Sequence, residues 1–186
     1  VVGPGAGISG RLLSSSFAEN LLPTLAGYAE ISPVAARALV TATRGSTTLG
    51  PASSLRAIAD TLVIPLIQAL GFIVEQRIDD PRGCVMRLMA ETVGCFSGGV
   101  IVIGYNQPLS SAWREAVRSG VSVDERWMFC SNGVSLRLVD LLRMWPRDYV
   151  EFDLYVLAED HITQTALWSL ARAEALADDV THLERA

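Results

Sequence analysis

The chain carries a literal G-x-G-x-x-G motif near its start, at residues 5–10 (GAGISG). In dinucleotide-binding enzymes this spacing lets a glycine turn approach a pyrophosphate, but it needs a strand before it and a helix opening at its last glycine. Here only Val1 and Val2 precede the motif closely enough to form such a strand. We therefore expect residues 1–10 to be irregular, and we keep a nucleotide-binding enzyme that uses this segment as the weaker functional alternative.

Lysine is absent from the chain, because all 15 residues of its Lys+Arg count are arginines. A P-loop needs a lysine to contact the phosphates of its nucleotide. Schiff-base enzymes need a lysine amine as nucleophile. The composition therefore excludes both chemistries for this chain, and it excludes any nuclease mechanism that uses a lysine of its own.

Arginines are the remaining cations that could contact phosphate groups. Two of them are four residues apart on an expected helix and would share one face of it, and three more follow an expected hairpin. The candidates for DNA contact are Arg114, Arg118, Arg137, Arg143 and Arg147. The alternative is a solvated face whose arginines pair with interspersed acids, since Glu115, Asp124, Glu125, Asp140 and Asp148 lie among them. Arginine contacts to phosphate would position DNA without reading its sequence.

The metal-ligating residues are few and scattered. Cys84, Cys95 and Cys130 form no C-x-x-C pair, and His161 and His182 lie far from them in sequence. Because zinc sites need several close ligands, we expect no metal and no other cofactor. The odd number of cysteines is typical of a reducing compartment, so we expect a cytoplasmic protein.

Half of the residues are apolar and the mean hydropathy is +0.33, while the net charge is −5. The length suits one compact domain. Such apolar content predicts that part of the surface is covered by a partner or by the rest of a longer chain. The start without methionine agrees with a fragment of a larger protein. The longest apolar run, residues 58–74, is interrupted by Asp60, Pro65 and Gln68, so we expect a buried helix and strand rather than a membrane span.

The element pattern predicts an α/β fold with a helical leader, residues 1–52, before a main domain, residues 53–186. In the leader, helical spacing over residues 16–28 is followed by Ser32-Pro33, typical of an N-cap and first turn, for a helix to about Thr43. In the domain, Ser53 or Ser54 caps a helix that Pro65 kinks and Gly71 ends.

The residue pattern in the rest of the domain predicts a mixed central sheet flanked by helices. Asn132-Gly133 is a strong hairpin signal between two strands. The expected strands are 72–78, 84–89, 100–103, 126–130, 135–139 and 149–154, with helices at 110–118 and 161–176. The strand at 100–103 is apolar at every position, so we expect both of its faces to be buried.

Residues 54–140 resemble the PD-(D/E)XK nuclease core, which has the same order of elements: a helix, three strands, a helix and a strand. The resemblance is to the N-terminal domains of restriction enzyme subunits and of large restriction-modification methyltransferases. Three segments carry it: the helix ending at residues 66–72 (LIQALGF), the strand at 100–105 (VIVIGY) and the hairpin at 127–138 (WMFCSNGVSLRL). The most specific part is Asn132-Gly133.

The resemblance implies a degenerate active site. The second strand, residues 84–89 (CVMRLM), lacks the family's metal-binding aspartate. On the third strand Ile103 stands where the family has its carboxylate, and Tyr105 stands where it has its lysine. A divalent metal needs such carboxylates to be held, so we expect no catalysis by this domain. The alternative is a migrated site built from Glu75, Asp79, Asp80 or Glu91.

The resemblance thus predicts a non-catalytic nuclease-like domain of a bacterial restriction-modification or DNA-defence protein. The parent protein would be a DNA methyltransferase or a restriction enzyme. The domain would dock on other domains of that protein, or contact DNA weakly through its arginines, with no role at a membrane. The alternative from another class is a protein–protein interaction module without DNA contact, which the apolar content and the acidic charge favour.

Overall fold

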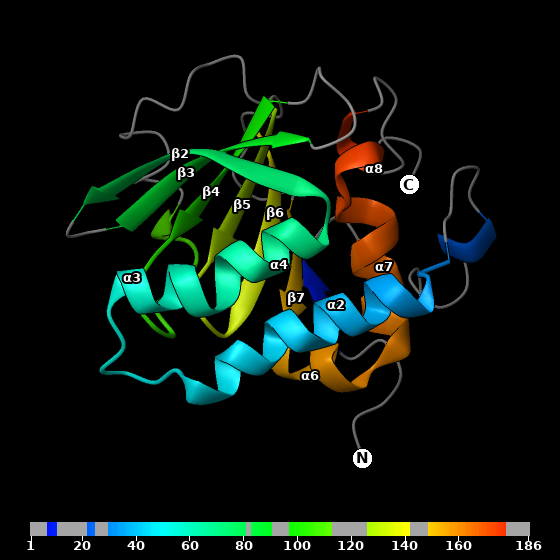
Figure 1. The fold of residues 1–186 in the computed structure, drawn as a ribbon, viewed down its shortest axis with the longest axis horizontal. Helices are drawn as coiled ribbons and strands as arrows, with labels where there is room; N and C mark the ends of the chain where they lie inside the picture. Colours follow the sequence, from blue (N-terminus) through cyan, green and yellow to red (C-terminus); the bar gives the residue numbers. More distant parts are fainter. Residues whose placement is uncertain are drawn as a thin grey trace.

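The computed structural model describes residues 7–10, 22–24, 30–80, 83–90, 97–112, 126–141 and 149–177. In these ranges the chain forms a mixed seven-stranded sheet with its helices gathered on one face (Figure 1). The predicted α/β fold with a mixed central sheet is therefore confirmed.

The sheet runs in the order β1-β7-β6-β5-β4-β3-β2. Its strands are β1 (Ile8–Gly10), β2 (Phe72–Asp80), β3 (Gly83–Ala90), β4 (Ser97–Val102), β5 (Trp127–Ser131), β6 (Ser135–Asp140) and β7 (Tyr149–Asp153). β4 and β5 are parallel, and the five other neighbouring pairs are antiparallel. The chain therefore makes a meander from β2 to β4, crosses over to β5, and returns through β6 and β7.

The helices that cover one face come from both ends of the chain (Figure 1). The described helical segments are α2 (Pro33–Thr43), α3 (Leu55–Ile58), α4 (Ile64–Ala69), α6 (Leu154–Glu159), α7 (His161–Ala171) and α8 (Ala173–Ala177), with 3₁₀ turns η1 (Leu22–Thr24) and η2 (Arg44–Thr48) and a π turn η3 (Ala59–Val63). In the part of the chain that the structure describes, none of these helices is long and apolar enough to cross a membrane.

The predicted N-caps of two helices are confirmed. The Ser32 hydroxyl accepts a hydrogen bond from the Ala35 N–H at 3.2 Å, and Pro33 opens α2. The Ser54 hydroxyl accepts from the Ala57 N–H at 3.1 Å and begins α3. Each hydroxyl satisfies a backbone donor that the first helical turn leaves unpaired.

The helix predicted between Ser54 and Gly71 forms, and it contains a π turn just before Pro65. Residues 59–63 widen to this π turn between α3 and α4, and the Ile64 N–H bonds to the Ala59 carbonyl. Pro65 has no N–H to continue the helical hydrogen bonds, and the widened turn lies directly before it. Gly71 ends the helix with φ +88°, as its position predicted.

The described parts of the leader belong to the same fold as the main domain. The prediction that residues 1–10 are irregular is wrong for Ile8–Gly10, which form edge strand β1 and pair with β7. Leu39 of α2 is fully buried in the core under the sheet. Of the helix predicted at 16–28, only the 3₁₀ turn η1 lies within the described residues.

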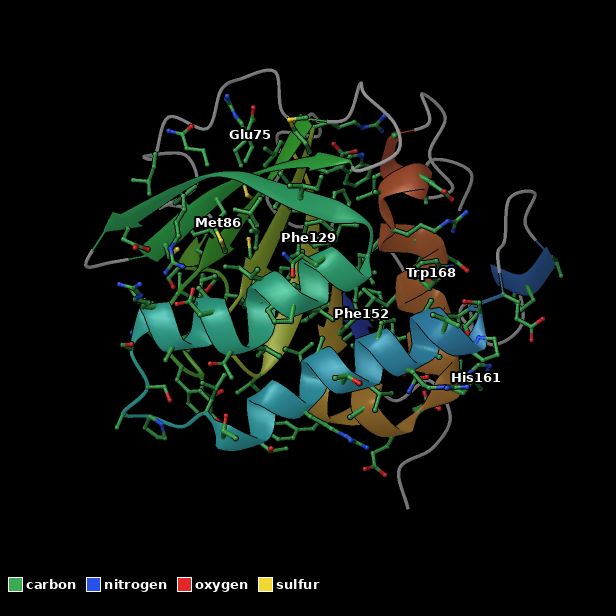
Figure 2. The ribbon with its side chains drawn as sticks, in the orientation of Figure 1. Glu75, Met86, Phe129, Phe152, His161 and Trp168 are labelled. Carbon is green, nitrogen blue, oxygen red and sulfur yellow. The ribbon has the colours of Figure 1, made fainter. Side chains whose placement is uncertain are left out.

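A large apolar core lies between the sheet and the helices, and a smaller one lies on the opposite face. The side chains of Met86, Phe129 and Phe152 point from the sheet into the larger core (Figure 2). Phe129 packs edge-to-face against Phe72, with ring centroids 5.7 Å apart. Residues 100–103 are buried on both faces, as predicted, because Ile101 and Ile103 belong to the smaller core.

The C-terminal part differs from the prediction in one helix. The strand predicted at 149–154 ends at Asp153, whose carboxylate caps an additional helix, α6, by accepting from the N–H groups of Tyr155 and Val156 at 2.8 and 3.1 Å. The helix predicted at 161–176 is broken at Arg172 into α7 and α8. Asp residues favour such caps over strand or helix interiors.

Candidate functional site

The candidate site lies where the parallel strands β4 and β5 end. Val102 and Ser131 are register partners, and the carboxyl ends of parallel strands are where α/β proteins gather functional side chains. The segments that follow the two strands stay hydrogen-bonded to each other. The Ile103 N–H donates to the Ser131 carbonyl and the Asn106 N–H donates to the Asn132 carbonyl, each at 2.9 Å.

The two degenerate positions of the expected site lie on opposite faces of the sheet. Ile103 is 1% exposed and packs in the smaller core, with Cys130. Tyr105 packs against the larger core, and its hydroxyl lies 3.2 Å from that of Tyr155. Residues two apart share a face only while a strand continues, and β4 ends at Val102. The structure therefore does not bring Ile103 and Tyr105 together into one site.

Tyr155 is the partner of Tyr105 that the sequence did not reveal. Its hydrogen bond with Tyr105 raises the pKa of the Tyr155 phenol, and partial burial adds to this. The raised pKa keeps the Tyr155 phenol protonated at neutral pH, so Tyr155 acts as a polar contact rather than as a base. The signal in sequence would have been the cap at Asp153, which begins α6 and places Tyr155 in its first turn.

The hairpin signature, Asn132 and Gly133, has a structural role. The Asn132 side-chain oxygen accepts from the N–H groups of Val134 and Ser135 at 3.0 and 2.8 Å, and its amide donates to the Gln107 carbonyl at 2.8 Å. Gly133 has φ +84°, which favours glycine. The predicted hairpin between β5 and β6 is confirmed, with three residues between the strands. Asn132 also ties the hairpin to the segment that follows β4.

The second strand of the expected site, β3, presents apolar groups to the helices. Cys84, Met86 and Leu88 are each 1% exposed or less and belong to the larger core. Burial raises the pKa of the Cys84 thiol to about 12. The thiol is therefore protonated at neutral pH and is a poor nucleophile and metal ligand.

A charged cluster lies next to Cys84, at the edge of the sheet. The Arg77 guanidinium lies between two acids: its Nε donates to Asp79 Oδ1 at 2.8 Å, and its Nη1 donates to Asp60 Oδ1. Arg77 and Asp79 come from β2, and Asp60 comes from the π turn. The hydrogen bond from Arg77 is the main cause that lowers the pKa of Asp79. Asp79 is thus an arginine-bound carboxylate and not a free metal ligand.

The other acids proposed for a migrated site do not join this cluster. Glu75 extends from the side of β2 that faces away from α3 and α4 (Figure 2). It precedes Gln76 at a β-bulge, where the register with β3 shifts. The Asp80 side chain and Glu91 lie outside the described residues. Within the described ranges, no group of three or more His, Cys, Asp or Glu side chains could hold a metal ion.

Arg137 is the one described member of the five arginine candidates, and it is engaged inside the fold. Its Nε and Nη2 donate to Glu151 Oε2 at 2.9 and 2.6 Å, and its guanidinium carbon lies 3.8 Å from the centre of the Tyr149 ring. The β6–β7 register places Arg137 opposite Glu151. Arg137 is therefore not available to a phosphate. Arg114, Arg118, Arg143 and Arg147 lie outside the described residues.

An apolar surface on β2 and β3 was missed by sequence reasoning. Ile73, Ile78 and Met89 are 49%, 51% and 41% exposed, and Ile73 pairs with Met89 across the two strands. Their neighbours along each strand, such as Phe72 and Leu88, point into the larger core. Ile78 lies five residues further along β2, beyond the exposed Glu75, Gln76 and Arg87. We name Ile73, Ile78 and Met89 together the β2–β3 apolar face, on the side of the sheet opposite the helices. Alternation in β2 was the available signal, but its bulge hides it.

The glycines of the G-x-G-x-x-G motif that the structure describes have packing roles. A Cβ on Gly7 would lie 2.8 Å from the Val156 side chain, and one on Gly10 would lie 2.3 Å from the Tyr149 carbonyl oxygen. Gly10 also has φ +124°. Residues 8–10 form an edge strand where a nucleotide fingerprint needs a phosphate-binding turn. The motif therefore lends no support to the nucleotide-binding alternative.

Comparisons with protein-family models, curated proteins and solved structures give no match to this chain. Function must therefore be argued from the arrangement of the elements and the residues themselves. That arrangement is a helix, an antiparallel meander of β2, β3 and β4, and a crossover to β5 parallel to β4. The residues at the end of β4 and β5 are apolar, phenolic or held in hydrogen bonds by the backbone.

Proposed function

We propose that this chain is a non-catalytic, nuclease-like domain of a bacterial restriction-modification or DNA-defence protein. It docks on other domains of that protein or contacts DNA weakly. The observation that carries the proposal is the combination of a nuclease-like element order with apolar residues where carboxylates would be needed. The parent protein would be a DNA methyltransferase or a restriction enzyme.

The element order supports the scaffold part of the proposal. The helix from Leu55 to Ala69 leads into β2, and β2, β3 and β4 form the meander that the resemblance implies. The parallel pairing of β4 with β5 follows a crossover, and the hairpin at Asn132 closes the unit. The helix predicted at 110–118 in that crossover lies largely outside the described residues, of which Ala112 is the last before the gap.

The side chains support the non-catalytic part. A two-carboxylate metal site stabilises the charge that develops on a transferring phosphate. In this fold Ile103 is buried among apolar groups, Cys84 is a protonated thiol, and Tyr105 contacts another phenol. Asp79, which lies next to Cys84, and Asp60 both bind Arg77, which supplies the positive charge that a metal would otherwise provide.

A DNA-cleavage assay tests the loss of catalysis. We expect the chain to leave supercoiled and linear DNA intact in Mg²⁺ or Mn²⁺, at the level of a metal-free control. Robust metal-dependent cleavage that Glu91→Ala abolishes would overturn the proposal, because it would reveal a migrated site. Glu174→Ala is the matched control, since Glu174 is a 64% exposed acid on α8, outside the candidates for a migrated site.

A DNA-binding assay tests the weak contact. We expect a dissociation constant of about 10⁻⁴ to 10⁻⁶ M for a short duplex, with affinity falling as salt rises, as for non-specific phosphate contacts. The double variant Arg114→Ala, Arg118→Ala should weaken binding and lower the salt dependence. Arg56→Ala is the control, because Arg56 is an 80% exposed arginine on α3, outside the candidate set.

A second candidate function is a protein–protein interaction module without DNA contact. The exposed Ile73–Met89 pair of the β2–β3 apolar face favours it, since apolar side chains that are exposed together can mark a contact surface. The binding assay separates the two candidates. Absence of DNA binding at low salt would favour the interaction module, whereas salt-sensitive binding lost in the Arg114 and Arg118 variant would contradict it.

A further inference from the structure

Strand β2 is an edge strand of the sheet. It is nine residues long, and among the strands that the structure describes β3 is its one neighbour (Figure 1). An edge strand leaves backbone N–H and C=O groups free to pair with another strand, and proteins often block such edges with lysine or a bulge. This chain has no lysine. The bulge lies between Val74 and Gln76, so residues 76–80 remain a regular stretch with Ile78 exposed at its centre.

Ile78 lies between residues of opposite charge, Arg77 and Asp79. This segment is therefore complementary to the same segment of a second copy that runs antiparallel to it. Arg77 and Asp79 face the helix-covered side, because they are register partners of Met86 and Cys84. If two β2 strands pair antiparallel about Ile78, Arg77 of each copy lies directly opposite Asp79 of the other. The same pairing brings the two Ile78 side chains together on the opposite face. One twofold axis generates all of these contacts, as in a symmetric homodimer.

The carboxylate of Asp79 is accessible to such a contact. It is 57% exposed, and within the chain it accepts from Arg77 through Oδ1. Asp60 holds the same guanidinium from the helix side, through Nη1. A carboxylate can accept several hydrogen bonds, so Asp79 can bind Arg77 of its own chain and that of a second copy together.

We propose that two copies of this chain associate through antiparallel, edge-to-edge pairing of residues 76–80 of β2, which joins the two sheets into one. The occupant of the edge is a second copy because the Arg77-Ile78-Asp79 pattern complements itself. A pairing this short buries little area, so the association is weak. The inference is independent of the proposed function, because it rests on β2 alone.

Sedimentation equilibrium of the 186-residue chain tests the association. We expect a monomer–dimer equilibrium between about 1 and 200 µM, the range typical of a small interface. Ile78→Lys should weaken the dimer at least about tenfold, because it places two like charges at the twofold axis. Ile73→Lys is the matched control, since Ile73 is equally exposed on the same strand but lies outside the paired stretch; its effect should stay within about twofold.

Charge exchange tests the register. Arg77→Asp and Asp79→Arg should each abolish self-association, because like charges would then face each other. Mixing the two variants should restore a dimer that contains one copy of each. Asp60→Asn controls for the loss of the pair between Asp60 and Arg77 within one chain, and it should leave the wild-type equilibrium unchanged. Thermal melting confirms that each variant is folded.

Three results would overturn the proposal. The first is a monomer at every concentration, which would also mean that any partner of this edge is another protein. The second is a dimer that Ile78→Lys does not weaken. The third is a mixture of the two folded charge variants that stays monomeric. If either charge variant does not fold, the comparison of Ile78→Lys with Ile73→Lys still decides the matter.

Discussion

The centre of the sheet and its β2 edge differ in the side chains that they bury and expose. At the centre, β4 and β5 are buried on both faces, and the polar groups that follow them are held by Asn132 and by paired phenols. At the edge, β2 and β3 expose Ile73, Ile78 and Met89. The ends of β4 and β5 are thus closed by core packing and hydrogen bonds, whereas exposed apolar side chains lie on β2 and β3.

The difference shows where this fold can change without unfolding. A residue at the centre has partners on both faces, so its replacement leaves a cavity or an unpaired group. A residue at the edge has partners on one face alone, so its replacement changes what the protein can contact. Two arginines illustrate this contrast: Arg137 binds Glu151 between two strands of the sheet, and Arg56 pairs with Asp60 at the surface.

Placing a carboxylate at the centre of the sheet should have the largest effect. Ile103→Glu buries an acid among apolar groups, so we expect a loss of about 3–5 kcal/mol in unfolding free energy at pH 7. Burial raises the pKa of such an acid. The part of the penalty that comes from ionisation is therefore absent well below the unfolded pKa and grows as the pH rises through it, while the cost of burying the neutral carboxyl remains at every pH. Urea midpoints should show a smaller loss at pH 4 than at pH 7.

Tyr105→Glu is the control for this variant, because Tyr105 is only partly buried. Its loss should be about 1 kcal/mol and should change little with pH. Equal losses for the two variants would contradict the distinction between the buried and the partly exposed position. Neither variant should gain DNA cleavage, since one carboxylate cannot hold a metal alone.

Asn132→Ala should have the next largest effect. It removes the acceptor of the Val134 and Ser135 N–H groups and the donor to Gln107. Leaving such groups unpaired costs about 1–3 kcal/mol. Gln107→Ala keeps the carbonyl that Asn132 contacts, so its loss should be about 0.5 kcal/mol or less. Urea unfolding of both variants measures the difference, and similar losses would mean that Asn132 does not tie the hairpin to the segment after β4.

The sequence predicts the helix caps, the helix end and the hairpin turn correctly, because each depends on contacts between residues that are close in the chain. Ser32 and Ser54 cap their helices, Gly71 ends one, and Asn132-Gly133 turns a hairpin, all through contacts within a few residues. Residues 100–103 were predicted to be buried on both faces because every one of them is apolar, and they are. Short-range hydrogen bonding and hydrophobicity are both visible in sequence.

The remaining features depend on pairing between distant segments. Ile8–Gly10 is a strand because β7 provides its partner, 140 residues later in the chain by the register of Gly10 with Val150. The sequence leaves Arg137 between phosphate contact and pairing with an acid, because its cross-strand partner Glu151 is identified only by the β6–β7 register. The opposite faces of Ile103 and Tyr105 depend on where β4 ends, and strand ends are poorly marked in sequence.

Arg137→Gln should cost less than Asn132→Ala. The Arg137–Glu151 pair is 16% and 21% exposed, and Arg137 also stacks on Tyr149. Its loss leaves a partly buried acid, so we expect a decrease of about 1–2 kcal/mol in unfolding free energy. Arg56→Gln is the matched surface variant, on α3, and an exposed pair of this kind contributes about 0.5 kcal/mol or less. An equal effect of the two variants would remove the contrast between an ion pair held within the sheet and an exposed one.

The smallest effect should be the titration of Asp79 at the edge. The hydrogen bond from Arg77 lowers the pKa of Asp79 below its ordinary value of 3.8. A lowered pKa in the folded state contributes stability above the unfolded pKa, and this contribution is lost as the pH falls through the folded pKa. The pH range in which this stability changes therefore lies below about pH 4, and solvent screening keeps the effect small because the carboxylate is exposed.

NMR titration of the Asp79 carboxyl carbon should show a midpoint below 3.8 that rises in Arg77→Gln. It should stay unchanged in Arg87→Gln, on the opposite face of β3, and an unchanged midpoint in Arg77→Gln would show that Arg77 does not hold this carboxylate in solution.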